Sequence, residues 1–331
     1  MGDVAMTVPV LRAFVKQHPD VKITVVSRPF FKPFFDTIPT VSFFAFDEKE
    51  RHKGFLGLIR LFQDLNRLEA DAFADLHNVL RAQVIRALFA LSGKKVAAVD
   101  KGRAEKKALT RAENKVFKPL SSMFERHVAV FQALGFKVDL TQPVFPVKAV
   151  LSEEITNIIG TETYKLIGIA PFAQYDSKVY PLDLMQQVID RLAQNTHCKI
   201  LLFGGGKKEI ELLDSFAAHK ANVITMAGKI KFQQELQLIS NLDVMLSMDS
   251  GNAHIAAMLG VKVITLWGAT HPYAGFMPFN QPLENVLVSN REQYPLLPTS
   301  VYGNKKVEGY EDVMRTISVE AVVKAVLPEN K

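Results

Sequence analysis

The sequence predicts an α/β fold of two doubly wound domains that face a cleft. Apolar strand-like runs alternate with amphipathic helical segments along the chain, a pattern typical of parallel sheets covered by helices. The chain has 331 residues, of which 48% are hydrophobic, and this is enough for two separate cores. Residues 139–152 carry Pro143 and Pro146 and lack periodicity, which indicates a linker between the halves.

The first half of the chain, residues 1–145, contains four predicted strands. Between them, Phe55–Leu68 has apolar residues close to a 3.6-residue period and Leu80–Leu91 repeats the pattern, so both are expected to be helices. A further helix is predicted over Glu125–Leu134, with Gly135 as its C-cap. The strands are expected at Lys22–Ser27, Val41–Phe46, Ala72–Leu76 and Lys95–Val99.

The second half, residues 153–310, repeats this organisation. A strand at Leu166–Ala170 precedes a predicted helix at Leu182–Gln194, and the final segment, residues 311–331, contains a helix over Val319–Leu327. No internal repeat or low-complexity tract is present in the sequence. The other strands are expected at Lys199–Phe203, Val223–Met226, Val244–Ser247, Val261–Leu266 and Asn285–Val288.

The net charge of +6, from 40 basic and 34 acidic residues, is concentrated in residues 101–118. This segment is either a solvated helix face or a patch that faces an anionic acceptor or anionic lipid headgroups. It carries a single aromatic residue, Phe117, and no recognised nucleic-acid motif, so a nucleic-acid partner is not expected. Against Glu105 and Glu113 it carries Lys101, Arg103, Lys106, Lys107, Arg111, Lys115 and Lys118.

Cysteine usage and hydropathy predict a cytoplasmic protein. The single cysteine, Cys198, begins an apolar strand and excludes a disulfide within the chain. No run of about 18 apolar residues is present, and the first residues do not form a signal peptide. We expect no metal ion and no cofactor, because the histidines are isolated in sequence from other ligand types.

Residues 249–257 are the most informative for function. They follow the apolar strand 244–248 and open an apolar helix. A strand that turns into a helix here leaves backbone N–H groups and the positive end of the helix dipole facing outward. We therefore expect an anion site, because a serine and a glycine let a phosphate approach the backbone closely. The alternative is an ordinary N-cap with a surface histidine. The residues concerned are Asp249, Ser250, Gly251 and His254.

Residues 260–272 form a second predicted strand that ends in a glycine turn. Together, residues 249–272 resemble the C-terminal signature of glycosyltransferase family 9, the heptosyltransferases that build the inner core of lipopolysaccharide. The shared elements are Asp-Ser-Gly, a histidine three residues after that glycine, Gly-Val-x-Val and Trp-Gly-x-Thr-x-Pro, all in register. The resemblance implies the GT-B fold, with the acceptor on the N-terminal domain, the nucleotide sugar on the C-terminal one, and the last helix packing back on the first.

Residues 2–11 are similar to the family element Gly-Asp-x-x-x-x-x-Pro-x-Leu. The resemblance makes Asp3 the general base, since an inverting transfer needs a carboxylate to accept the proton of the attacking hydroxyl. The alternative is an N-cap or first-turn acid. Family members have an apolar strand before this glycine. Its absence here indicates a misassigned or truncated start and predicts exposed sheet edges.

Residues 170–181 follow the first strand of the second half. Their end, Lys178-Val179-Tyr180-Pro181, resembles the family pattern Lys-x-Trp-Pro, with tyrosine in place of tryptophan. The resemblance assigns Lys178 to the donor diphosphate, where an ammonium group would neutralise the charge of the leaving group. The alternative is a loop lysine in water.

Two further loops are weaker candidates. The glycine-rich loop 204–209 lacks the spacing of a Walker motif. The resemblance instead makes Glu209 a candidate for contact with the ribose. Met226, Ala227 and Gly228 resemble the family segment that lies beside the base through backbone contacts. The alternative for both loops is a plain turn.

The resemblance therefore implies an inverting glycosyltransferase that moves a heptose or related sugar from a nucleoside diphosphate, ADP in relatives, to a lipopolysaccharide core or lipid A type acceptor. Peripheral contact with the inner membrane is expected through residues 101–118. Two alternatives remain open: a degenerate relative that binds a nucleotide sugar without transferring it, and a nicotinamide oxidoreductase. The latter is disfavoured, since no Gly-x-Gly-x-x-Gly follows a first strand. The sugar, the acceptor and the oligomeric state are not determined by the resemblance.

Overall fold

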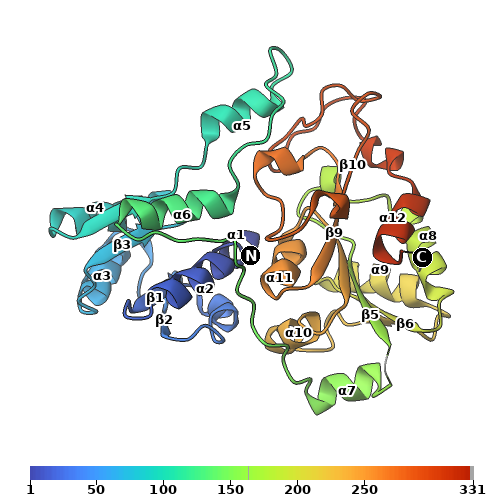
Figure 1. Cartoon of the computed structure of the whole chain (residues 1–331), viewed down its shortest axis with the longest axis horizontal. Coiled ribbons are helices and arrows are strands. Elements are labelled where there is room, and N and C mark those ends of the chain that lie inside the picture. The colour runs from blue at the N-terminus through green and yellow to red at the C-terminus, as the bar shows by residue number, and fades with distance from the viewer. Residues whose placement is uncertain (163, 329–331) are drawn as a thin grey trace. The chain divides into compact units, whose positions relative to one another are not determined.

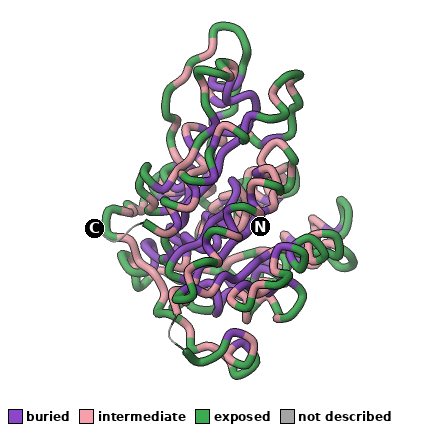
Figure 2. Tube along the Cα trace, turned by 90° about the vertical axis from the view of Figure 1, so that its right-hand side faces the viewer, coloured by how far each residue is buried: buried purple, intermediate pink, exposed green. Residues whose placement is uncertain are grey.

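The computed structural model describes residues 1–162 and 164–328, which form two compact units. The first unit contains Asp3–Arg103 and Ser121–Pro146. The second contains Ala104–Leu120 and the chain from Val147 onward. In each unit the buried residues run through the interior and the exposed residues lie mainly on surface loops and outer helix faces, as Figure 2 shows.

The first unit holds two separate parallel sheets of two strands each. β1 (Ile23–Ser27) pairs with β2 (Val41–Ala45), and β3 (Ala72–Asp75) pairs with β4 (Lys95–Ala98). All four predicted strands are present, but the expected single doubly wound sheet is not, because no strand among the described residues joins β1 to β3. Each pair forms its own backbone ladder and depends on the helices that cover it.

The helices of the first unit begin and end close to their predicted positions. α3 and α4 bury Leu61, Leu65, Ile85 and Phe89 in a small core of their own with Phe46. α6 begins two residues before its predicted start, because Ser122 and Glu125 form a reciprocal capping box. The helices are α1 (Gly2–Ala5), α2 (Thr7–Gln17), α3 (Gly54–Asn66), α4 (Leu80–Leu91) and α6 (Met123–Ala133).

The second unit is built on one six-stranded parallel sheet in the order β10-β9-β8-β5-β6-β7. The chain passes from β5 outward to β7, then returns to β8 and continues to β10 on the other side (Figure 1). The winding therefore reverses between β5 and β8. The strands are β5 (Lys165–Ala170), β6 (Cys198–Leu202), β7 (Val223–Thr225), β8 (Val244–Met248), β9 (Lys262–Trp267) and β10 (Val286–Val288).

Helices cover both faces of this sheet. α8 packs with α12 on one face, and α11 packs with α10 on the other (Figure 1). Buried apolar side chains from β5, β6, β8, α8 and α12 form one continuous core, in which Cys198 is buried. The helices are α7 (Glu153–Ile159), α8 (Leu182–Ala193), α9 (Lys207–Ala217), α10 (Phe232–Ile239), α11 (Gly251–Met258) and α12 (Val319–Val326).

The position of the last helix differs from the expectation that it packs back on the first domain. Val319, Val322 and Val326 are buried in the core of the second unit, against α8. The ion pair between Arg191 and Glu320, 2.7 Å apart, fixes the same contact at the surface. The amphipathic pattern identified a helix with one buried face, but not the surface that buries it.

Residues 104–120, expected in the first domain, belong to the second unit. The Leu120 N–H donates to the Tyr273 carbonyl at 3.0 Å. The Lys115 ammonium donates to the Pro298 carbonyl at 2.8 Å, and burial lowers the pKa of Lys115 to about 8. This arm, which includes most of α5 (Arg103–Thr110), is therefore held by directed contacts.

The same contacts divide the basic charge of residues 101–118. Lys106 is buried, with its ammonium nitrogen 4.2 Å from the centre of the Phe276 ring. The Arg291 guanidinium lies over the Phe117 ring, 3.4 Å from its centre, in a cation–π contact. The seven basic residues therefore do not form a single solvent-exposed patch. Those that are exposed are Arg103, Lys107, Arg111 and Lys118.

We expect the second unit to lose stability at mildly acidic pH because of His271. Burial, and then the charge of Arg291, lower the pKa of His271 to about 4, below its ordinary value of 6.5. Between these pH values the unfolded chain binds a proton that the folded chain does not, so the free energy of unfolding falls as pH falls, by about 2–3 kcal/mol. Urea unfolding from pH 7 to pH 4.5, followed by the fluorescence of the single tryptophan, Trp267, measures this loss.

The variant His271→Asn keeps an acceptor for the Tyr273 N–H, which bonds His271 Nδ1 at 3.1 Å, but does not titrate. It should flatten the acid dependence, whereas the exposed control His219→Asn should not. An unaltered pH slope in His271→Asn would contradict the assignment.

Candidate functional site

The reversal of winding between β5 and β8 creates the candidate site. The two strands are parallel neighbours, with Ala170 opposite Ser247, so their carboxyl ends lie side by side. β9 extends the same edge, with Leu266 opposite Met248. In open α/β sheets, ligands bind outside the carboxyl ends of strands at such a switch point. The loops that follow β5, β8 and β9 therefore meet where a ligand is expected.

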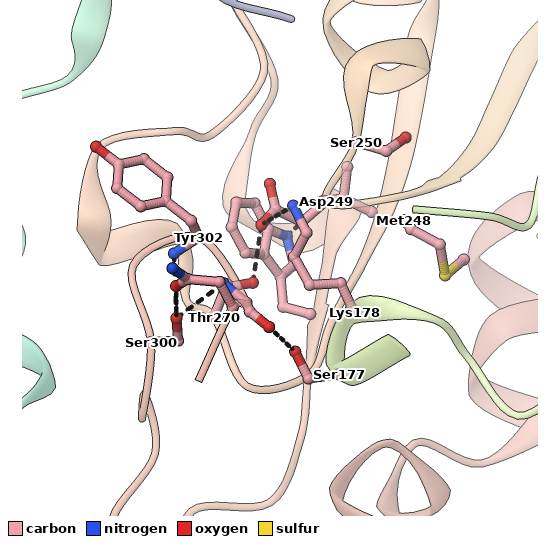
Figure 3. A network of polar contacts seen from close by, with 12 residues as sticks. Ser177, Lys178, Met248, Asp249, Ser250, Thr270, Ser300 and Tyr302 are labelled. Atoms are coloured by element: carbon pink, nitrogen blue, oxygen red, sulfur yellow. Dashed lines mark hydrogen bonds and ion pairs between the residues drawn. The ribbon is translucent and has the colours of Figure 1, made fainter. Parts of the chain in front are cut away.

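These three loops are joined by one carboxylate. Asp249, after β8, accepts the Lys178 ammonium at 3.3 Å and the Thr270 hydroxyl at 2.8 Å, both at Oδ2, as Figure 3 shows. The side chains of Lys178 and Asp249 are only 12% and 9% exposed. The predicted site residues Lys178 and Asp249 are thus in direct contact, although they are 71 positions apart.

Close backbone packing fixes the position of Lys178. The Ser177 carbonyl accepts the Ala269 N–H at 3.0 Å, and a Cβ on Gly268 would lie 2.3 Å from that oxygen. The Ser177 hydroxyl donates to the Gly303 carbonyl at 2.6 Å (Figure 3). A Cβ on Gly303 would meet Lys178 Cγ at 2.6 Å. Glycine is therefore required at both positions for the lysine stem to lie where it does.

Tyr180, which replaces the family tryptophan, anchors the end of this loop. Its side chain is fully buried, and its hydroxyl donates to the Ile317 carbonyl at 2.7 Å. Burial raises the pKa of Tyr180 to about 12. An aromatic side chain with a polar end thus ties the Lys178 loop to the segment before α12.

The start of α11 is the predicted anion site. Ser250 is the N-cap residue, yet its side chain does not cap the helix. Its hydroxyl instead makes a 3.1 Å hydrogen bond with the hydroxyl of Ser247. The first-turn amides, which begin at Gly251, are therefore not satisfied by the cap side chain, and they carry the positive end of the helix dipole. His254 lies buried on the same helix.

The weaker site predictions lie along the same edge of the sheet. Glu209, in the first turn of α9, accepts the N–H of Gly205 in the loop after β6 at 2.8 Å. A Cβ on Gly204 would lie 3.3 Å from Phe172, so this loop touches the loop that carries Lys178. Met226, Ala227 and Gly228 follow β7, the outermost strand on that side, with Met226 and Ala227 buried.

Asp3 belongs to the first unit and is described within it. It lies on α1, and its side chain is 69% exposed. The nearest ionisable partner that the structure shows is His77, whose Nε2 is 3.9 Å from Asp3 Oδ2. The carboxylate is thus accessible to a substrate hydroxyl.

Sequence reasoning missed the residues that hold the site together. Thr270 was visible only as part of the Trp-Gly-x-Thr pattern, and Ser177, Ser300 and Gly303 gave no signal. The Ser300 hydroxyl accepts the Gly303 N–H at 2.9 Å and shapes the turn against Lys178. In the described part of the chain, no three His, Cys, Asp or Glu side chains gather closely enough to hold a metal ion. No helix of that part is long and apolar enough to span a membrane.

Comparison with known sequences identifies the family. Residues 58–305 match the family model for glycosyltransferase family 9 (heptosyltransferase). The chain is 23% identical to lipopolysaccharide heptosyltransferase 3 of Escherichia coli, over 99% of this chain and 97% of that protein. It is also 23% identical to the lipopolysaccharide core heptosyltransferase OpsX of Haemophilus influenzae, over 98% of this chain and 92% of that protein.

Solved structures agree on the fold. A family 9 glycosyltransferase from Veillonella parvula has a TM-score of 0.73 at 20% identity, covering 98% of this chain and 92% of that one. The Escherichia coli ADP-heptose lipopolysaccharide heptosyltransferase II has a TM-score of 0.67 at 19% identity, covering 98% and 94%. Heptosyltransferase WaaC of Escherichia coli, solved with ADP, has the same score and identity, covering 97% and 94%. The predicted GT-B class of α/β fold is confirmed.

Substitution of Gly303 tests whether the close packing of Lys178 shapes the anion site. Gly303 has φ +84°, so Gly303→Ala adds backbone strain of about 1–2 kcal/mol and also displaces the Lys178 stem. The matched control is Gly309→Ala, at φ +77° with open space around its Cβ. Both variants should lose stability in urea, with the larger loss in Gly303→Ala because its Cβ also meets the Lys178 stem. Only Gly303→Ala should weaken the binding of inorganic pyrophosphate measured by calorimetry. Equal affinities in the two variants would refute the packing argument.

Proposed function

The chain belongs to glycosyltransferase family 9, and on that premise we propose that it transfers a heptose or a related sugar from ADP-heptose to a lipopolysaccharide core or lipid A type acceptor, with inversion at the anomeric carbon. The relatives support this proposal, because they are named as lipopolysaccharide heptosyltransferases and the similarity extends over nearly their whole length. Relatives solved with ADP and with ADP-2-deoxy-2-fluoro heptose support the donor.

The observation that carries the proposal is the Lys178–Asp249 pair beside the start of α11, at the reversal between β5 and β8. The backbone at Ser250 and Gly251, with His254 behind it, and the Lys178 ammonium hold the donor diphosphate. Lys178 also neutralises the charge that grows on the diphosphate as the glycosidic bond breaks. Asp249 orients the ammonium group and orders the turn.

The nucleoside extends from this point along the carboxyl edge of the sheet. Glu209 accepts hydrogen bonds from the ribose hydroxyls. The N–H of Gly205, in the loop before α9, already orients its carboxylate. The backbone of Met226, Ala227 and Gly228 lies beside the base. The second unit is therefore the donor-binding domain and the first unit the acceptor-binding domain.

Asp3 acts as the general base. It accepts the proton of the acceptor hydroxyl while the oxygen of that hydroxyl forms a bond to the anomeric carbon. The bond from that carbon to the diphosphate oxygen breaks, and its electron pair leaves with ADP. Attack from the face opposite the leaving group inverts the configuration, and the sugar passes through an oxocarbenium-like transition state.

The acceptor places the enzyme at the cytoplasmic face of the inner membrane. The exposed basic residues of the 101–118 segment suit contact with anionic headgroups or with the phosphates of the acceptor. This contact would be weakened by salt, because exposed charges are screened over about 10 Å at 0.1 M.

Asp3→Ala should abolish transfer while donor binding stays near the wild-type value. The substitution removes the proton acceptor but leaves the second unit unaltered, so turnover should fall by about 10²–10⁴. Mass spectrometry of the product and calorimetry with ADP measure the two properties. Unchanged turnover would remove Asp3 from the mechanism. Binding without transfer by the wild-type chain would identify a degenerate relative instead.

Lys178→Met should weaken ADP binding about tenfold to a hundredfold, because a charge-assisted contact of about 1.5–3 kcal/mol is lost. Lys262→Met is the matched control, since Lys262 is exposed at the amino end of β9, the edge opposite the site. A crystal soaked with ADP provides a second measurement. Nucleotide lodged away from residues 249–254 would overturn the proposal.

A further inference from the structure

The loop after β3 presents an exposed imidazole on an unusually well-braced turn. His77 stands at the tip, with its side chain 61% exposed. Beneath it, the buried Asp75 carboxylate accepts the His77 N–H at 3.1 Å and the Asn78 N–H at 2.6 Å through Oδ1. Its other oxygen accepts the Arg86 guanidinium at 3.0 Å. This bracing acts on the backbone that carries the histidine, whose ring contributes little buried surface.

Asn78 adds a strained residue to the same turn. Its φ of +46° lies in the left-handed region, which is uncommon for residues other than glycine, although asparagine adopts it more often than most. Its side chain holds it there, because Nδ2 donates to the Val99 carbonyl at 2.9 Å and Oδ1 accepts from Gln83 at 3.0 Å. A strained backbone that is held by several polar contacts is typical of functional turns.

A second histidine joins this turn to the segment that carries Asp3. His127, on α6, is 1% exposed, and its ring faces both the Leu76 backbone, directly before His77, and the Met6 backbone, directly after α1. Burial lowers the pKa of His127 to about 4, so the ring is neutral at pH 7. His127 therefore packs as an uncharged ring between the turn at His77 and the segment after α1.

The outcome of this bracing is the contact between His77 and Asp3. The 3.9 Å between His77 Nε2 and Asp3 Oδ2 exceeds a hydrogen bond by less than about 1 Å, a gap that a rotation of either exposed side chain closes. Catalytic hydrogen bonds are commonly long before the substrate binds. No other ionisable side chain is shown within ion-pair distance of Asp3 among the described residues.

We propose that His77 is a positioning residue for the base: its Nε2–H donates to one oxygen of Asp3 and directs the other oxygen toward the acceptor hydroxyl. The inference rests on the proposed function, in which Asp3 accepts that proton. The charged groups around the pair are the Met1 amino group, Asp75 and Lys101. A hydrogen bond donated to the carboxylate stabilises its ionised form, which is the form that base catalysis needs.

The test compares His77→Ala, His77→Gln and the exposed control His219→Gln in the full chain. The assay uses ADP-heptose with deacylated, heptose-deficient lipopolysaccharide. His77→Ala should lower kcat about tenfold to a hundredfold with little change in KM. Glutamine can still donate a hydrogen bond, so His77→Gln should recover most of kcat, and His219→Gln should match the wild type.

Three results would overturn the proposal: wild-type kcat in His77→Ala, a loss in His77→Ala that lies in KM and not in kcat, or a loss in His77→Gln as large as in His77→Ala. Asn78→Ala is a second variant that keeps the imidazole but relaxes the turn, and it should lower kcat in the same direction. The turnover of Asp3→Ala tests the proposed function separately. If Asp3→Ala turns over normally, Asp3 is not the base, whereas an inactive Asp3→Ala beside a normal His77→Ala refutes only the positioning role.

Discussion

The nearly buried ion pair between Lys178 and Asp249 is the constraint on which the second unit's function depends. Charges with so little exposure are expensive to desolvate, and such a pair persists only when its geometry and its other hydrogen bonds are good. Thr270 supplies the additional bond to the carboxylate. The pair requires β5, β8 and β9 to be neighbours, because only then do their carboxyl-end loops meet. The order of the strands in the sheet is therefore what brings the residues of the site together.

In the proposed reaction, the pair also explains how one lysine can serve the diphosphate leaving group. A carboxylate beside a phosphate site repels the ligand, so Asp249 lowers the affinity that Lys178 alone would give. In return, the ammonium is held at a fixed position before the donor arrives, which reduces the ordering cost of binding. The amides at the start of α11 contribute fixed partial positive charge without a counter-ion. In the proposed reaction, the backbone amides and the lysine therefore share the binding of the diphosphate, and the lysine also acts on the charge that develops as the bond breaks.

The sequence predicted the strands and the main site loops because both depend on local pattern. Continuous apolar runs mark buried parallel strands. Asp249 follows one of them directly, and Lys178 lies in the loop after another. The partners of these loops were not predictable: Gly303 is recognised only when Lys178 lies against it. For the same reason the surfaces that bury the last helix and the 104–120 arm were not predictable. An amphipathic or basic pattern shows that one face of a segment differs from the other, but not what covers either face. Lys106, for example, is covered by Phe276, an aromatic residue far away in the sequence.

The two units hold their functional groups by different physical means. In the second unit, the site loops extend from a continuous six-stranded sheet, so the ladder itself sets their spacing. In the first unit the sheet is divided into two pairs, and no ladder connects the turn at His77 with α1. The position of this turn depends instead on polar braces: the Asp75–Arg86 pair, the Asn78 side chain and the His127 ring. Removing one partner of a buried pair leaves an uncompensated charge, so these braces are sensitive to substitution in a way that an apolar core is not. A divided sheet therefore makes the chemistry proposed for Asp3 depend on polar braces and not on a backbone ladder.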